Sequence, residues 1–88
     1  MSNNSDYFEE LVGEVLYLKN KGKVVDFLKG ILTPQELEQL PLRLQIVKML
    51  KRGVPQREIC EKLGVGIGTV TRGSREIGKG RFRYIGKK

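Results

Sequence analysis

The chain has 88 residues, a formal net charge of +7 and an isoelectric point near 9.8. This length predicts one domain with a small core, to which a second copy of the chain would add. Histidine is absent and Cys60 is the one cysteine, which excludes an internal disulfide, the usual zinc sites and histidine-based catalytic triads. We therefore expect no enzyme, no catalytic residue and no metal site.

The charge is unevenly distributed along the chain. Residues 1–40 carry a net −3, whereas residues 41–88 carry a net +10. A basic half beside a mildly acidic half is typical of a polyanion-binding surface with a separate partner-binding part; the alternative is a solvated surface that merely happens to be basic. No apolar run approaches the roughly 20 residues of a membrane span, and the polar residues 1–7 are unlike a signal peptide. We expect a soluble cytoplasmic protein.

Two amphipathic helices are predicted near the N-terminus. Apolar residues recur at helical spacing over residues 6–18. A second apolar stripe runs from Val24 to Ile31, and its helix is expected to end near Gly30. These stripes are long for so small a domain. Their apolar surface is expected to be buried either against the other helices of the chain or against a second chain.

The next helix has a clear start signal. Thr33 is expected to be its N-cap, Pro34 its first residue and Glu36 the partner of Thr33 in a capping box. We expect this short helix to stop before Pro41, because proline disfavours helical geometry in the residue before it.

Three more helices follow, giving about six in an all-α fold. The first covers residues 42–52, with Leu44, Val47 and Leu50 facing inward, and ends at Gly53 as a left-handed C′ residue. Pro55 opens a helix to Leu63, and a last helix covers residues 67–77. No alternation typical of a strand is found.

Residues 56–77 match a helix-turn-helix. Ile59 and Leu63 face inward, Cys60 is the small residue at the helix crossing, Gly64 supplies the positive φ of the turn, and Val65 fills it. Val70 and Ile77 anchor the second helix. An ordinary helical hairpin is the alternative interpretation.

The start of the second helix carries short residues that suit entry into a major groove. Gly68, Thr69 and Thr71 are expected to point outward, and Arg57, Arg72 and Arg75 to contact phosphate or guanine rather than only solvent. The free amides and dipole of this helix favour a nearby phosphate. The residues predicted to bind DNA are Gln56, Arg57, Ile67, Gly68, Thr69, Thr71, Arg75 and Lys79.

The tail after Gly78 interleaves basic and aromatic residues. We interpret residues 78–88 as a basic, flexible arm that tracks phosphates, or alternatively as a floppy terminus. A glycine inside a helix, such as Gly73, costs about 1 kcal/mol relative to alanine. Either the helix is loose at this point, or another group packs closely against its backbone.

The chain resembles the bacterial Trp repressor family over about residues 32–77. The resemblance rests on Leu32-Thr33-Pro34, Arg52-Gly53 and, above all, the run from Leu63 to Ser74 with its Gly-Ile-Gly-Thr-Val-Thr-Arg-Gly-Ser sequence. It implies an intertwined all-helical homodimer that binds a palindromic operator in double-stranded DNA. In these terms residues 1–32 are dimerisation helices and residues 33–77 are the core with the helix-turn-helix.

The resemblance also implies a co-repressor, L-tryptophan, between the core and the second helix of the motif. Arg43 and Arg72 would enclose the indole and meet the carboxylate, and Gly73 would allow the ligand's close approach. Glu76 replaces a serine that helps to hold the ligand's ammonium, so Glu76 either substitutes by its charge or indicates another ligand. A leucine that lines the family's pocket from the partner subunit is replaced by Gly30, and the last family helix is replaced by the basic tail. The residues predicted to bind ligand are Thr33, Arg43, Arg72, Gly73 and Glu76.

The leading hypothesis is a sequence-specific transcriptional repressor, controlled by L-tryptophan or a similar small molecule. The alternatives are a DNA-binding accessory module of the transposase or replication-initiator type, a non-specific nucleic-acid-binding protein, and, last, a small enzyme.

Overall fold

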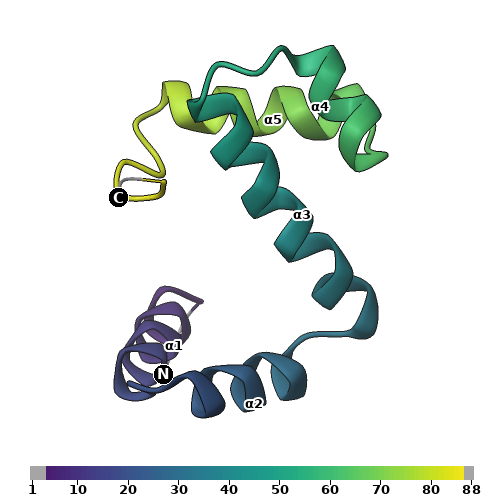
Figure 1. The fold of residues 1–88 in the computed structure, drawn as a ribbon. Helices are drawn as coiled ribbons and strands as arrows, with labels where there is room; N and C mark the ends of the chain where they lie inside the picture. The colour runs from purple at the N-terminus through teal and green to yellow at the C-terminus, as the bar shows by residue number, and fades with distance from the viewer. Residues whose placement is uncertain (1–3, 87–88) are drawn as a thin grey trace. The chain divides into compact units, whose positions relative to one another are not determined.

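The computed structural model describes residues 4–86, which form helices joined by turns, without a strand among them. The chain divides after Leu37 into two compact units (Figure 1). Helix α3 begins in the first unit and continues into the second. The predicted all-α fold is confirmed, while the tail residues 87–88 and the N-terminal residues 1–3 lie outside the described part of the chain.

The first unit contains α1 (Asn4–Tyr17), α2 (Lys21–Ile31) and the start of α3. Asn20 caps α2, because its side-chain oxygen accepts a hydrogen bond from the backbone N–H of Lys23 at 2.9 Å. Neither α1 nor α2 has a buried residue within the chain. The apolar stripes of both helices are therefore left largely uncovered by the chain's own residues.

The predicted capping box of α3 (Pro34–Lys51) is present. The N–H of Glu36 donates to the hydroxyl oxygen of Thr33 at 3.2 Å, and the N–H of Thr33 donates to the Glu36 carboxylate at 2.8 Å. The predicted break before Pro41 is wrong, because α3 continues through it. Pro41 removes one backbone donor, but the residues after it carry much of the core, and their packing outweighs the local preference.

Five helices are therefore described instead of about six. The C-terminal end of α3 was predicted correctly: Gly53 has a φ of 83°, and its N–H donates to Leu50 O at 2.9 Å while that of Val54 donates to Met49 O at 3.1 Å. This is the Schellman pattern, which satisfies the last carbonyls of a helix.

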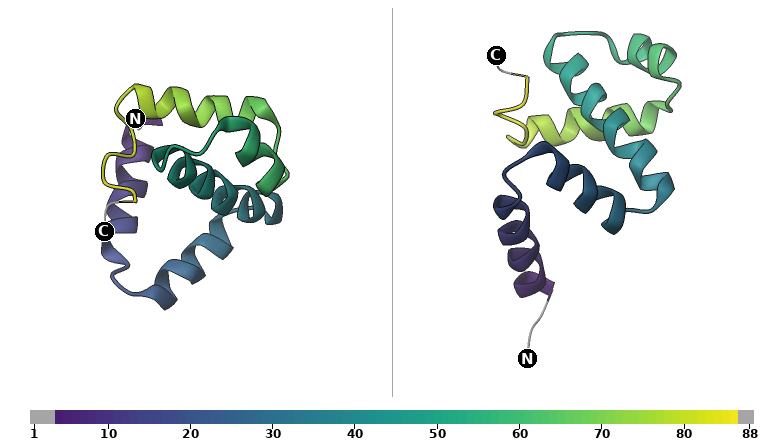
Figure 2. Two further views of the ribbon diagram at one scale, coloured as in Figure 1. Left: turned by 45° about the horizontal axis from the view of Figure 1, so that its top comes forward. Right: turned by 60° about the horizontal axis from the view of Figure 1, so that its bottom comes forward.

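The core of the second unit joins α3, α4 (Gln56–Leu63) and α5 (Ile67–Gly78). Its central cluster is fully or almost fully buried: Ile46 and Met49 from α3, Ile59 from α4 and Val70 from α5. Figure 2 shows α3 and α5 side by side in the left view and crossing in the right view. Leu50, Val54, Cys60, Leu63 and Val65 pack around this cluster.

One predicted core residue of α3 is wrong. Leu44 is 44 % exposed, whereas Val47 is buried as predicted and Leu50 is half-buried. The periodicity predicted the helix correctly but placed Leu44 on its buried face. Because α3 is apolar around much of its circumference, the spacing of apolar residues alone does not determine which side is buried.

Candidate functional site

The predicted helix-turn-helix is formed by α4, a tight turn and α5 (Figure 1). Gly64 adopts the left-handed conformation, with a φ of 66° and a ψ of 36°, and its N–H donates to Cys60 O at 2.9 Å. This ends α4 and lets the chain reverse. The packing of Val65 and Cys60 against the core confirms the roles assigned to both from the sequence.

The first turn of α5 is open to solvent. Ile67 is 57 % exposed, Gly68 and Thr69 are exposed, and no side chain caps the free N–H groups after Gly66. A helix start of this kind offers backbone donors and the positive end of a helix dipole to a phosphate. Arg57, Arg75 and Lys79 are exposed on α4 and at the end of α5.

Thr71 differs from its prediction. It was expected to point outward, but it is half-buried, and its hydroxyl donates to the side-chain oxygen of Gln56 at 3.1 Å. Both residues were predicted to bind DNA. In this structure they join the start of α4 to α5, and such a bond fixes one helix relative to the other.

A pocket of about 480 Å³ lies between α3, α5 and the segment after α5. Four of the five residues predicted to bind ligand line it, namely Arg43, Arg72, Gly73 and Glu76. The fifth, Thr33, belongs to the first unit and takes part in the capping box. The remaining residues that line the pocket are Ile46, Val47, Gly68, Thr69, Arg81 and Phe82.

The close approach at Gly73 comes from α3. A Cβ on Gly73 would lie 3.3 Å from Cγ2 of Ile46 and 3.4 Å from Cδ1 of Leu50. Of the two interpretations made from the sequence, close contact with its backbone is therefore the one that holds. Protein side chains make that contact, and Gly73 also lines the pocket.

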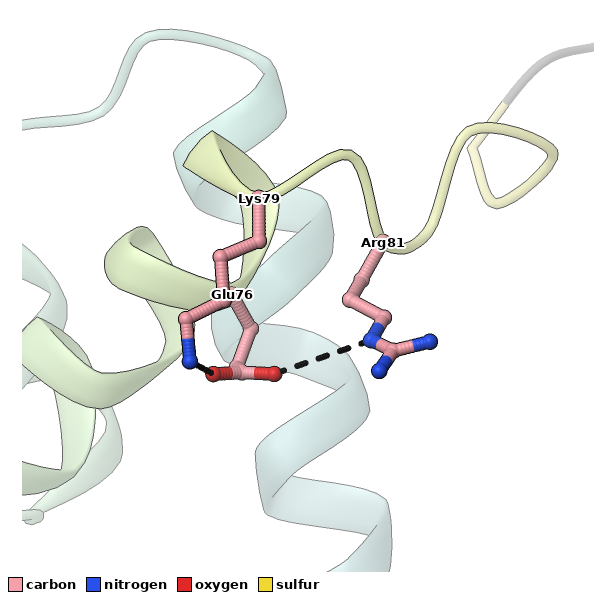
Figure 3. A network of polar contacts seen from close by, with 3 residues as sticks. All are labelled: Glu76, Lys79 and Arg81. Atoms are coloured by element: carbon pink, nitrogen blue, oxygen red, sulfur yellow. Dashed lines mark hydrogen bonds and ion pairs between the residues drawn. The ribbon is translucent and has the colours of Figure 1, made fainter.

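Glu76 already has cationic neighbours (Figure 3). Its carboxylate lies 2.9 Å from Lys79 Nζ and 3.8 Å from Arg81 Nε. The hydrogen bond from Lys79 is the largest cause of a lowered pKa for Glu76. Desolvation opposes it, and the charges of Lys79, Arg81 and Arg72 each lower the pKa by a smaller amount. Glu76 is therefore an ionised carboxylate whose charge is offset within the chain.

The part that the tail plays in the pocket was not predicted from the sequence. Residues 79–86 form successive turns, and Lys51 Nζ donates to the backbone carbonyls of Phe82 and Ile85, the latter at 2.6 Å. This brings Arg81 and Phe82 to the pocket. Gly80, just after the last helix, was the available signal, because glycine at that place often turns the chain back on itself.

Other kinds of site find no support in the described part of the chain. Residues 4–86 contain no group of three or more cysteine, aspartate or glutamate side chains placed to hold a metal ion. None of the helices described is long and apolar enough to cross a membrane.

Comparison with known proteins identifies relatives over most of the chain. The Trp repressor protein family profile matches residues 6–85. A Trp operon repressor homolog of Actinobacillus succinogenes is 40 % identical over 75 residues, which cover 84 % of this chain and 74 % of the relative. Its counterpart in Pasteurella multocida is 38 % identical over 78 residues, which cover 88 % of this chain and 76 % of the relative. No solved structure matches significantly. On these matches, the chain belongs to the Trp repressor family.

Proposed function

We propose that this protein is a transcriptional repressor that binds a specific DNA site through α4 and α5. The observation that carries the proposal is the open first turn of α5, where Ile67, Gly68 and Thr69 are exposed beyond the Gly64 turn. Short side chains let a helix start approach base edges in a major groove. We assign base contacts to Gly68 and Thr69 and an apolar contact to Ile67.

Charge supports the same assignment. The half of the chain that contains the motif has a net +10, and phosphate contacts supply much of the affinity of such proteins. Arg57, Arg75 and Lys79 are the exposed cations that we assign to phosphates or guanine, while Gln56 and Thr71 hold α4 and α5 in register. Acting on bacterial DNA, the repressor would work in the cytoplasm.

We further propose a homodimer that buries the apolar faces of α1 and α2. Large apolar side chains of α1 and α2 are uncovered within one chain; Phe8 is 62 % exposed and Leu16 72 %. Apolar surface on this scale is usually covered by a partner, and a twofold dimer suits a palindromic operator because each copy reads one half-site. Elution with the mass of a monomer at micromolar concentration would contradict this.

The pocket supports control by a small molecule. Arg43 and Arg72 supply cations for a carboxylate, and Ile46 and Val47 supply an apolar wall. We propose that L-tryptophan or a similar small molecule binds there as co-repressor, with Gly73 as a further contact. No catalytic residue is assigned, because binding alone accounts for repression.

The test starts with selection of binding sites from random DNA by the purified protein, with and without L-tryptophan. We expect one enriched palindrome, bound about 10³-fold or more over random DNA. If no sequence is enriched and the affinity for DNA varies with salt concentration but not with sequence, the result would favour non-specific nucleic-acid binding instead.

Two variants then test the residues. Thr69→Ala and Arg57→Ala should each weaken binding by about 1–3 kcal/mol at particular base pairs. Arg52→Ala removes the same charge as Arg57→Ala from the exposed turn after α3 and should change little. Equal losses on all sequences would contradict direct readout.

A further inference from the structure

The segment after α5 folds back on itself instead of extending freely. Gly80 has a φ of 96°, its N–H donates to Ile77 O at 2.9 Å, and the N–H of Arg81 donates to Glu76 O at 3.1 Å. These two bonds are those of a Schellman motif with Gly80 at C′. The chain therefore reverses at a defined point directly after α5.

Lys51 holds the following turns against the end of α3. Its Nζ donates to the carbonyls of Phe82 and Ile85, and the N–H of Ile85 donates to Phe82 O at 3.2 Å. Phe82 adopts a φ of 63°, a strained conformation for an aromatic residue that persists only where surrounding contacts impose it. Residues 79–85, which we call the anchored segment, are therefore ordered and attached to α3.

The anchored segment carries three exposed cations, Lys79, Arg81 and Arg83. Figure 3 shows Lys79 and Arg81 on either side of Glu76, whose carboxylate lies 2.9 Å from Lys79 Nζ and 3.8 Å from Arg81 Nε. This carboxylate offsets one of the three charges. The side chain of Arg81 is still 71 % exposed, so its guanidinium has room to meet a second anion.

Arg83 has no such partner. A Cβ on Gly80 would lie 3.0 Å from a terminal guanidinium nitrogen of Arg83, which shows that this side chain folds over the backbone at Gly80. Among residues 4–86 no carboxylate pairs with Arg83, and Arg83 does not line the pocket. Its charge is therefore exposed, held in place and not neutralised by the described part of the chain.

We propose that the anchored segment is a second DNA-binding surface, which binds backbone phosphates outside the base pairs contacted by the start of α5. The inference rests on the proposed repressor function and adds a sequence-independent contact to it. Residues 76–85 carry a net +2. Duplex DNA, with about one negative charge per 1.7 Å of its axis, is the polyanion that suits such a surface.

The length of α5 separates this surface from the bases. Ile67 and Gly78 are the ends of α5, and a rise of about 1.5 Å per residue places them roughly 16 Å apart along the helix axis. The major groove is about 8.5 Å deep. For a helix that enters the groove by its first turn, the anchored segment lies beyond the groove, where DNA presents phosphates and no base edges.

Two other uses of these cations lead to different measurable effects. Basic residues at the end of a helix stabilise its dipole, which affects unfolding and leaves DNA affinity unchanged. Pairing with the acidic half of a second copy, where residues 1–40 carry a net −3, would affect the mass of the oligomer. The proposed DNA contact instead affects the salt dependence of DNA binding.

The experiment measures the affinity of the full chain over a range of salt concentrations, on the selected operator and on a random duplex of equal length. Arg83→Ala should lower the affinity roughly fivefold to tenfold at about 0.1 M salt, and should reduce the slope of log K against log salt by about 1, because one phosphate contact is lost. Both changes should be the same on the two duplexes. An unchanged slope, or a loss confined to the operator, would overturn the proposal.

Two further variants serve as controls. Arg83→Lys keeps the charge and should keep the slope, because lysine binds phosphate as a point charge. Arg52→Ala removes the same charge as Arg83→Ala from the exposed turn after α3 and should leave the slope unchanged. A reduction of the slope by Arg83→Lys, or an equal reduction by Arg52→Ala and Arg83→Ala, would overturn the assignment of Arg83.

Lys51→Met tests whether the anchor positions the segment. Release of residues 79–85 should lower the affinity for both duplexes about threefold, because a free segment loses conformational freedom when it binds. The neighbouring variant Arg52→Ala removes one charge from the same part of the chain. Equal effects of these two variants would overturn the role of the anchor.

Two measurements on Arg83→Ala exclude the other partners. Its oligomer mass at the concentration of the DNA titration should equal that of the parent chain, and a shift toward the monomer would assign the anchored segment to a second copy. Its affinity should fall more on duplex DNA than on duplex RNA of equal length, and the reverse would assign the segment to RNA. Either of these contrary results would overturn the proposal.

Failure of this inference is distinguishable from failure of the repressor proposal. A chain that selects a palindrome, and whose Arg83→Ala variant keeps the parent slope, is a repressor without this surface, which overturns the inference alone. A chain that selects no site, and whose slope on random DNA falls with Arg83→Ala, supports the surface and contradicts sequence-specific repression.

Discussion

The hydroxyl of Thr71 on α5 lies 3.1 Å from the side-chain oxygen of Gln56, the first residue of α4. This hydrogen bond is partly buried and joins the two helices of the helix-turn-helix directly. In the sequence both residues resemble residues that contact bases. In the structure their side chains bind each other, which gives them a role in joining α4 to α5.

The first prediction concerns the energy of that bond. Thr71→Val keeps the shape of the side chain and removes its donor, and Gln56→Ala removes the acceptor. In a double-mutant cycle on urea unfolding at fixed protein concentration, we expect an interaction energy of about 1 kcal/mol. Additivity within about 0.3 kcal/mol would show that the bond contributes nothing to stability.

The second prediction concerns the two glycines of α5 that line the pocket. Gly73→Ala brings a Cβ to 3.3 Å from fully buried Ile46, so overpacking should outweigh the gain in helix propensity and lower the free energy of unfolding by about 1 kcal/mol. Gly68→Ala meets no atom within 4 Å and should raise the free energy by a few tenths of a kcal/mol. The same urea titration measures both; a stabilising Gly73→Ala would contradict the packing argument.

The third prediction concerns the pH dependence of Glu76. Its pKa is lowered in the folded chain, chiefly by the hydrogen bond from Lys79. A carboxyl with a lowered folded pKa contributes stability above its unfolded pKa, roughly 4.3, and loses that contribution as the pH falls through the folded value.

Carboxyl NMR titration between pH 2 and 6 should therefore give Glu76 a midpoint below that of an unpaired glutamate. Lys79→Met should raise this midpoint toward the ordinary value. A midpoint that Lys79→Met leaves unchanged would contradict the assignment of the shift to that hydrogen bond.

The fourth prediction concerns the attachment of the tail. Lys51→Met keeps most of the side-chain volume and removes the donor that bonds the carbonyls of Phe82 and Ile85. Chymotrypsin should then cleave faster after Phe82 and Tyr84, as followed by mass spectrometry. Lys62→Met removes the same charge from exposed α4 and serves as control; equal acceleration by both variants would argue against a specific latch.

The sequence predicted correctly those features that depend on interactions between residues close together in the chain. The Thr33–Glu36 capping box and the left-handed Gly53 and Gly64 depend on backbone groups a few residues away, and each was predicted correctly. The pattern of the helix-turn-helix likewise placed Ile59 and Val70 in the core, where both are fully buried.

The errors concern features that depend on contacts between residues far apart in the sequence. Pro41 is tolerated inside α3 because residues after it pack against α4 and α5, which no local preference records. Thr71 turned out to have a partner fifteen residues away. Arg81 was interpreted as part of a free arm, because the sequence does not show that Lys51 binds the tail.

Gly68 and Thr69 belong to two proposed sites at once, the DNA-reading start of α5 and the lining of the pocket. Their shared position makes ligand and operator thermodynamically linked. Whatever factor a bound ligand adds to operator affinity, the operator must add to ligand affinity. On this proposal the DNA-bound protein would bind its ligand more tightly than the free protein does, so that an occupied operator would stay liganded at ligand concentrations that leave the free protein empty.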